Sequence, residues 1–231
     1  MLTTIAPIIA AFFLRSGHTF PFPLMNTTAP NNATISNTTM PLPANITVPQ
    51  YECENVFPSD LTVVNQRYPD YNESHLHTAH SYFMLRREVG SDGEIATVVH
   101  FDNLPSNSSN TTCRLEFILP DVATQTISGF NPTFNVYQVK LEPDSIATWN
   151  TYAANADTPL YGTVNGQAEA LERTRSVGGV AAISESRCND TMTFQMGMVY
   201  NSKDGLPNYW EFPQVSLPAW PVQGFRMVYG C

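Results

Sequence analysis

Residues 95–120 constrain the fold of this chain more than any other stretch of its sequence. In their second half, apolar residues occupy every second position, at Leu115, Phe117 and Leu119. This spacing is the period of a β-strand with one buried face. The stretch predicts a hairpin with strands at 95–101 and 114–119, joined by a polar loop that closes on Cys113. The loop carries two N-glycosylation acceptors, and because a glycan requires solvent we expect the loop at the surface.

Similar short patterns recur along the chain, separated by glycine, asparagine and proline, which favour turns. The predicted strands are 81–86, 95–101, 114–119, 134–141, 177–183, 192–200, 209–212 and 225–229. The clearest is the core strand 192–200, whose one face carries Met192, Phe194, Met196, Met198 and Tyr200. Only residues 168–175 have a helical pattern. Strands without interleaved helices favour an all-β fold, and we expect an antiparallel, jelly-roll-like β-sandwich over residues 51–231.

The first fifty residues have a different composition. An apolar run at 5–14 is followed by Ser16 and Gly17, so residues 1–17 are expected to be a signal peptide, and the run is too short to cross a bilayer. Residues 18–50 are rich in Asn, Thr and Pro, with too little apolar area to offset the entropy of ordering them. They predict a disordered, glycosylated stalk. No other apolar run is long enough to span a membrane, so we expect secretion without membrane insertion.

Glycosylation acceptors and cysteines also indicate a secreted protein. The eight acceptors are Asn26, Asn32, Asn37, Asn45, Asn72, Asn107, Asn110 and Asn189. The four cysteines allow two disulfides in three pairings. Loop-closure entropy separates the pairings by only about 1 kcal/mol, so it does not choose among them. We favour Cys188 with Cys231 and Cys53 with Cys113, because this pairing would fasten the last strand and the entrance of the domain.

The charge balance limits the partners. The formal net charge is −9, and eleven basic residues are scattered along the chain. Nucleic-acid binding rests largely on clustered lysine and arginine, so a nucleic-acid partner is not expected. Polysaccharide and a surface protein remain as alternative partners, and the sequence does not determine the oligomeric state.

Catalytic and metal-binding signals are weak. His75, His77 and His80 have a spacing that metal sites use, but a solvated loop explains them as well, and we predict neither a metal nor a cofactor. A glycosidase needs two carboxylates at a defined separation. The acidic candidates are Glu116, Asp121, Glu142, Asp144 and Glu211, and no spacing among them singles out a pair. Glu211 is the most interesting because Trp210 and Phe212 flank it, although an exposed strand carboxylate would look the same. We expect no catalytic residues.

Trp149, Trp210 and Trp220 lie at expected loops or strand ends, with Tyr152 and Tyr209 nearby. Exposed aromatic rings on a rigid sheet can stack on the apolar face of a pyranose. The three tryptophans are therefore the predicted ligand-binding residues. The alternative is that their rings cover the ends of the sandwich.

Several short motifs carry a family resemblance. They are Val-Val-His-Phe-Asp at 98–102, Thr-Cys-Arg-Leu-Glu-Phe-Ile-Leu-Pro at 112–120, Phe-Asn-Val-Tyr at 134–137, Thr-Trp-Asn-Thr-Tyr at 148–152, a strand after Cys188, and Gly-Phe-Arg-Met-Val-Tyr-Gly-Cys at 224–231. In order, these motifs resemble the carboxy-terminal domain of the fungal secreted family named after the ubiquitin 3 binding protein. The resemblance covers residues 82–231 and implies a secreted or cell-surface fungal β-sandwich without an established catalytic role. Residues 161–186 are longer than the family pattern, and ubiquitin binding is not carried over to a secreted chain.

Together these observations predict a secreted, N-glycosylated, disulfide-stabilised β-sandwich on a stalk. Its predicted role is that of a noncatalytic structural or carbohydrate-binding module of the fungal cell surface or cell wall. The alternatives are an enzyme acting on cell-wall polysaccharide and a protein-binding secreted effector. A carboxylate pair in a cleft would favour the enzyme, a row of exposed rings the sugar-binding module, and a larger apolar patch the effector.

Overall fold

The structure is a computed structural model that describes residues 53–71, 81–90, 93–106, 111–141, 145–154, 158–200 and 206–231. All of these residues belong to the unit Pro49–Cys231. The predicted signal peptide at 1–17 and stalk at 18–50 lie outside the described residues. So do the predicted sites Asn26, Asn32, Asn37, Asn45, Asn72, Asn107, Asn110, His75, His77 and His80. Asn189 is described, and it is exposed beside the buried Cys188.

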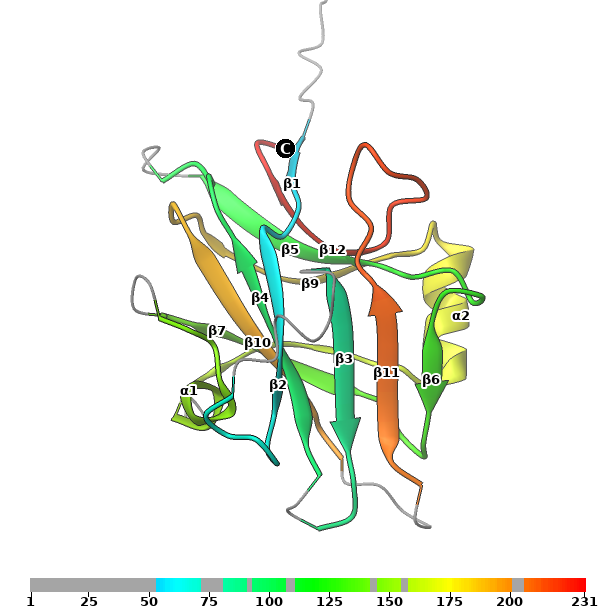
Figure 1. Cartoon of the computed structure of the whole chain (residues 1–231). Helices are drawn as coiled ribbons and strands as arrows, with labels where there is room; N and C mark the ends of the chain where they lie inside the picture. The colour runs from blue at the N-terminus through cyan, green and yellow to red at the C-terminus, as the bar shows by residue number, and fades with distance from the viewer. Residues whose placement is uncertain are drawn as a thin grey trace, which may run out of the picture. The chain divides into compact units, whose positions relative to one another are not determined.

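Two antiparallel sheets build the domain (Figure 1). The larger contains, in spatial order, β6 (Thr126–Ser128), β11 (Asn208–Pro213), β3 (Tyr82–Arg87), β4 (Ile95–Phe101), β10 (Met192–Met198), β7 (Phe134–Val139) and β8 (Leu160–Val164), while β2 (Asp60–Asn65) also pairs with β4. The smaller contains β1 (Glu54–Val56), β12 (Gly224–Tyr229), β5 (Thr112–Ile118) and β9 (Val180–Arg187). The predicted antiparallel β-sandwich is confirmed.

Alternating aromatic and aliphatic side chains form the core. The largest fully buried rings are Phe83, Phe101, Phe117, Phe134, Phe194, Trp210, Phe212 and Phe225. They come from both sheets, and Phe117 of β5 contacts Trp210 of β11 edge to face, with ring centroids 5.6 Å apart. Such contacts add about 1 kcal/mol per pair to the burial of apolar area. The core therefore fixes the inward face of each strand, and the intervening residues are left on the outward faces.

The central strand β10 is buried on both faces. Its Met192, Phe194, Met196 and Met198 belong to the core, as predicted, whereas Tyr200 lies beyond the end of the strand and is 49% exposed. On the opposite face, Tyr152 of helix α1 (Trp149–Ala154) lies so close to Gly197 that a Cβ there would be 2.1 Å from the tyrosine hydroxyl. Gly197 therefore makes room for α1 against the sheet.

The predicted hairpin between residues 95–101 and 114–119 is wrong. Strand β4 lies in the larger sheet, between β10 and β2, whereas β5 lies in the smaller sheet, between β12 and β9. Leu115 and Phe117 of β5 alternate into the core as expected, but alternation identifies a buried face and not the partner strand. The chain between the two strands therefore crosses from one sheet to the other.

All the predicted strands are present, with ends that differ by at most four residues, and helix α2 spans Ala168–Ser176. Four strands, β1, β2, β6 and β8, and helix α1 were not predicted. Strand β2 does not alternate because its four central residues are all buried, and α1 has only six residues. Among the residues that the structure describes, no helix is long and apolar enough to cross a membrane.

The favoured disulfide pairing is also wrong. The structure pairs Cys53 with Cys231 and Cys113 with Cys188, at Cα separations of 4.6 and 5.0 Å. The register explains both bonds. Glu54 pairs with Tyr229, which brings the residues just before β1 and just after β12 together, and β5 pairs with β9, which brings the start of β5 to the end of β9. The first pair is exposed and the second is buried in the core.

Candidate functional site

The structure separates the three predicted tryptophans. Trp210 is fully buried in the core, and its indole Nε1 donates a hydrogen bond to Gln125 Oε1 at 3.0 Å. The prediction that Trp210 presents an exposed ring is therefore wrong: it occupies an inward position of β11, where the alternation makes it part of the core. Trp149 begins α1, is half-buried and packs on Tyr152 with ring centroids 4.8 Å apart. Trp220 is different, because 82% of it is exposed.

Trp220 lies on the loop between β11 and β12, and two glutamines hold the base of this loop. Gln214 is buried and bonds Phe225 twice, accepting from its backbone N at 2.7 Å and donating to its carbonyl oxygen at 2.9 Å. The second, Gln223, donates to the carbonyl of Pro213 at 2.8 Å. Backbone hydrogen bonds between Val215 and Gln223 at 3.0 and 3.1 Å close the base of the loop. The loop therefore presents Trp220 from a fixed stem.

The outward surface of β3 and β11 begins at this loop, and we call it the β3–β11 face. It consists of Tyr82, Met84, Arg86, Tyr209 and Glu211, whose inward neighbours on the same strands belong to the core. The register places Tyr82 opposite Pro213, the last residue before the loop, and then Met84 opposite Glu211 and Arg86 opposite Tyr209. Strand β6 pairs with the other edge of β11, so the three strands lie side by side (Figure 1).

Glu211 is the centre of this face. Its Oε2 accepts a hydrogen bond from the Tyr82 hydroxyl at 2.8 Å and another from the Tyr209 hydroxyl. Burial alone would raise the pKa of Glu211, but hydrogen bonds from Tyr209, Tyr82 and Thr126 outweigh it and lower the pKa below its ordinary value. Burial, together with the Glu211 carboxylate, raises the pKa of Tyr82 to about 12 and also raises the pKa of Tyr209. At neutral pH the face therefore holds an ionised carboxylate between two neutral tyrosines.

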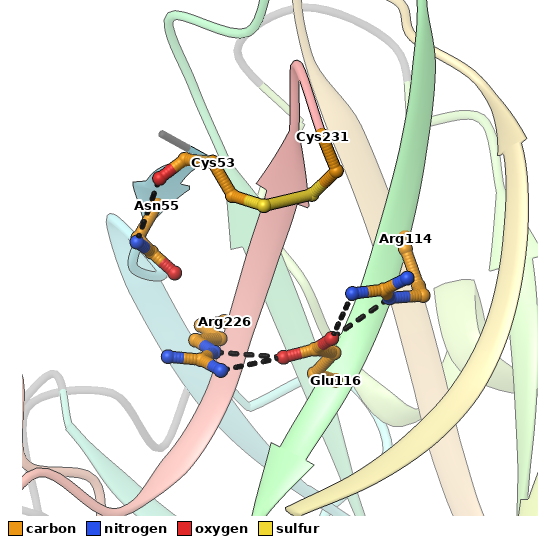
Figure 2. Close-up of polar contacts among 6 residues, drawn as sticks. All are labelled: Cys53, Asn55, Arg114, Glu116, Arg226 and Cys231. Carbon is orange, nitrogen blue, oxygen red and sulfur yellow. Dashed lines mark hydrogen bonds and ion pairs between the residues drawn. A yellow bond between two sulfur atoms is a disulfide. The ribbon is translucent and has the colours of Figure 1, made fainter. Parts of the chain in front are cut away.

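A second charged cluster lies on the smaller sheet (Figure 2). Glu116 is buried, and Arg114 and Arg226 approach its two oxygens, each at 2.7 Å. The guanidinium groups come from opposite sides of the carboxylate, as Figure 2 shows. Because Glu116 forms ion pairs with both arginines, we interpret this cluster as a structural link between β5 and β12. We call these three residues the Glu116 clasp.

A third cluster has the order of groups found in hydrolytic triads. The Thr193 hydroxyl lies 2.7 Å from His100 Nδ1, and His100 Nε2 lies 2.9 Å from Asp102 Oδ1. If Asp102 accepts the Nε2 proton, Nδ1 can accept the threonine proton, which is the arrangement that activates a nucleophile. Thr193, however, is only 4% exposed. A substrate cannot reach this hydroxyl, so we interpret the cluster as a polar link between β4 and β10.

Within the described ranges, no group of three or more His, Cys, Asp or Glu side chains could hold a metal ion. The histidines at 75, 77 and 80 lie outside those ranges. The carboxylates Glu116 and Glu211 are on different sheets, and each is held by its own hydrogen-bond partners. They do not form the carboxylate pair that a glycosidase requires.

No protein-family model matches the chain, and no curated protein matches it. The resemblance to the fungal secreted family therefore stays a prediction.

Tyr82, Arg86 and the link through His100 were not among the predicted site residues. Alternation in 81–86 could have placed Tyr82 and Arg86 on an outward face. Their approach to Tyr209 and Glu211 could not be found in this way, because it depends on the pairing of two strands that are more than a hundred residues apart.

Proposed function

We propose that this protein is a secreted, N-glycosylated, noncatalytic carbohydrate-binding module of a fungal cell surface or its surroundings. Two disulfides in an all-β fold fit a stabilised extracellular protein. The fungal setting comes from the sequence resemblance, and secretion and glycosylation come from the leader and the acceptors.

The observation that carries the proposal is the exposure of Trp220 on a loop with a hydrogen-bonded stem. An indole face is a good surface for stacking on a pyranose. A stem that is already ordered lowers the entropy that binding must overcome. The loop continues into the β3–β11 face, where Glu211 and the hydroxyls of Tyr82 and Tyr209 offer hydrogen-bonding groups for sugar hydroxyls.

The two alternative functions have less support. A polysaccharide hydrolase would need an accessible nucleophile or a carboxylate pair, and Thr193 is buried while Glu211 accepts from two tyrosines. A protein partner is favoured by one observation. The loop tip around Trp220 is apolar, and Leu217 in the same loop is 62% exposed. The experiment below separates the two uses of this tip.

The test is depletion of the secreted protein by insoluble chitin, β-glucan and cellulose, with variants of the same loop. We expect one polymer to retain the wild type and Trp220→Ala to weaken retention by about ten-fold, through loss of ring stacking. Leu217→Ala is the matched control, because it shortens an exposed apolar side chain in the same loop without removing a ring. Trp210→Ala is not informative, because it removes a core ring.

Equal losses for Trp220→Ala and Leu217→Ala would show unspecific apolar adsorption in place of ring stacking, and would move support to a protein partner for this loop tip. No retention on any polymer would overturn the proposal.

A further inference from the structure

Glu211, at the centre of the β3–β11 face, differs from the other glutamates that are partly or fully buried. In the described part of the chain these are Glu88, Glu94 and Glu116, and each of them forms an ion pair with at least one arginine. Glu211 is half-buried as well, but its partners among the described residues are hydroxyl groups and not cations. Within these residues, therefore, its negative charge has no counter-ion.

Neutral hydroxyls restrain this carboxylate. The Tyr82 hydroxyl donates to Glu211 Oε2 at 2.8 Å, and the Tyr209 hydroxyl donates to the same oxygen. Burial opposes the ionisation of Glu211, but hydrogen bonds from the two tyrosines and Thr126 outweigh it and lower the pKa of the carboxyl group. The carboxylate is therefore ionised in mildly acidic solution as well as at neutral pH, and its position is restrained before a ligand arrives.

The surroundings of Glu211 suit a cationic ligand. Tyr209 lies on the same face of β11, and Tyr82 lies on the neighbouring strand β3. Aromatic rings attract ammonium groups, so the two rings can add to the attraction of the carboxylate. Arg86 is the cationic residue of this face, but it pairs with Glu88 at 2.5 Å. Since the formal net charge of the chain is −9, its field also favours the approach of a cationic polymer over an anionic one.

Glu211 is also connected to the proposed stacking residue along one surface. Tyr82 stands opposite Pro213, the last residue before the loop that carries Trp220. At the other edge of β11, Glu211 stands opposite Thr126 of β6, which is exposed. A polysaccharide that stacks on Trp220 can therefore extend along β11 and place another of its residues at Glu211.

We propose that Glu211 binds the ammonium group of an amino sugar, in a polysaccharide whose neighbouring residues lie along the β3–β11 face toward Trp220. The ligand class is thus a glucosamine polymer with free amines. This inference rests on the proposed carbohydrate-binding function and names the class of sugar. An ammonium group gives the carboxylate a charge-assisted hydrogen bond, which a neutral, N-acetylated sugar cannot provide.

The test compares glucosamine oligomers with N-acetylglucosamine oligomers of the same length by calorimetry, using the secreted protein at mildly acidic pH. Acetylation keeps the sugar rings and removes the charge. We expect the free amine to bind about ten-fold tighter than the acetylated oligomer, with the difference shrinking as salt is added. Glu211→Gln should abolish this discrimination and leave binding of the acetylated oligomer within about two-fold, because it keeps the shape of the side chain and removes its charge.

Glu172→Gln, on the exposed side of α2, is the matched control, because it removes the same charge elsewhere and should change nothing. Oligolysine of the same positive charge is the second comparison, since it is cationic and has no sugar rings. It should bind at least about ten-fold more weakly than the glucosamine oligomer. Discrimination that survives Glu211→Gln, or equally tight binding of oligolysine, would overturn the inference.

The wild type alone can also decide, even if Glu211→Gln folds poorly, because equal binding of the free and acetylated oligomers would contradict the proposed contact. If neutral polysaccharides deplete the protein through Trp220 and the free amine has no advantage, only the amino-sugar inference fails. If neither neutral nor amino sugars bind, the proposed function fails with it.

Discussion

Arg226 and Glu116 face one another across β12 and β5, and both Nε and Nη2 of the arginine lie within 2.9 Å of the same carboxylate oxygen, Oε2. Arg114, on the same strand as Glu116, occupies the other oxygen. The carboxylate is 5% exposed, so neither charge of the central pair is fully hydrated. Cross-strand pairs of this kind set the register of a sheet, and this one lies between the strands that carry the two disulfides.

Removing the central charge of this clasp should destabilise the domain. Glu116→Gln leaves two arginines without their counter-charge, and we expect a loss of about 2–3 kcal/mol in the free energy of unfolding, measured by urea titration. Glu54→Gln, on the exposed strand β1 of the same sheet, is the control and should cost less than about 0.5 kcal/mol. Equal effects of the two substitutions would show that the clasp contributes nothing specific.

The two disulfides should differ in their accessibility to reductant. Cys53 and Cys231 are exposed, whereas Cys113 and Cys188 are buried in the core. Mild reduction under native conditions, followed by alkylation and peptide mapping, should label Cys53 and Cys231 first, because a thiolate must reach a sulfur to exchange. The unreduced sample should contain peptides that link Cys113 to Cys188. Simultaneous labelling of all four cysteines would contradict the burial difference.

Glu211 should give the β3–β11 face a pH-dependent contribution to stability. Its pKa is lowered in the folded state, so the contribution is complete above the ordinary value of 4.5 and is lost as the pH falls through the lower folded value. Because the side chain is partly exposed, Glu211→Gln should cost only about 1 kcal/mol at pH 7, and the cost should shrink as the pH falls from 4.5 through the lower folded pKa.

Thermal unfolding of Glu211→Gln and wild type over this pH range provides the measurement, with Glu172→Gln on the exposed side of α2 as the control. A cost that does not vary with pH would indicate lost packing and not a lost carboxylate.

We expect position 197 to require glycine, because the Tyr152 hydroxyl occupies the space that a Cβ would need. A Cβ at this position would be 2.1 Å from the Tyr152 hydroxyl oxygen and 3.3 Å from the ring carbon that carries it. Gly197→Ala should therefore cost about 1–3 kcal/mol, as overpacking does. In a Tyr152→Phe background Gly197→Ala should cost about 1 kcal/mol less, because the phenylalanine no longer places an oxygen where the new Cβ lies.

Double-mutant cycles in urea would measure this coupling. A cycle with Tyr161→Phe, on β8, should be additive. Additivity in the Tyr152→Phe background as well would show that the hydroxyl does not limit this position.

Local patterns in the sequence were sufficient for the individual elements. Alternation predicted β5 and β10 and the inward face of β10, because the pattern depends only on neighbouring residues and on which side they bury. The position of α2 was also predicted. The same rule failed for β2, since its apolar residues Val63 and Val64 are adjacent and no period of two can be seen. The fold class followed from the number of strands and the scarcity of helices.

Pairing between distant segments was decided only by the tertiary structure. Several partners are compatible with the same alternation, so β4 and β5 could be expected as a hairpin although they belong to different sheets. The disulfides followed the register of β1 with β12 and of β5 with β9, which no spacing of cysteines encodes. Likewise, Trp210 and Trp220 both lie near aromatic and apolar residues in the sequence, but an inward strand position buries the first ring and a loop exposes the second. The conformation of short segments, and for several strands the buried face, could be predicted from neighbouring residues alone. Which surfaces meet, and therefore which side chains form the candidate site, depended on the packing of the whole core.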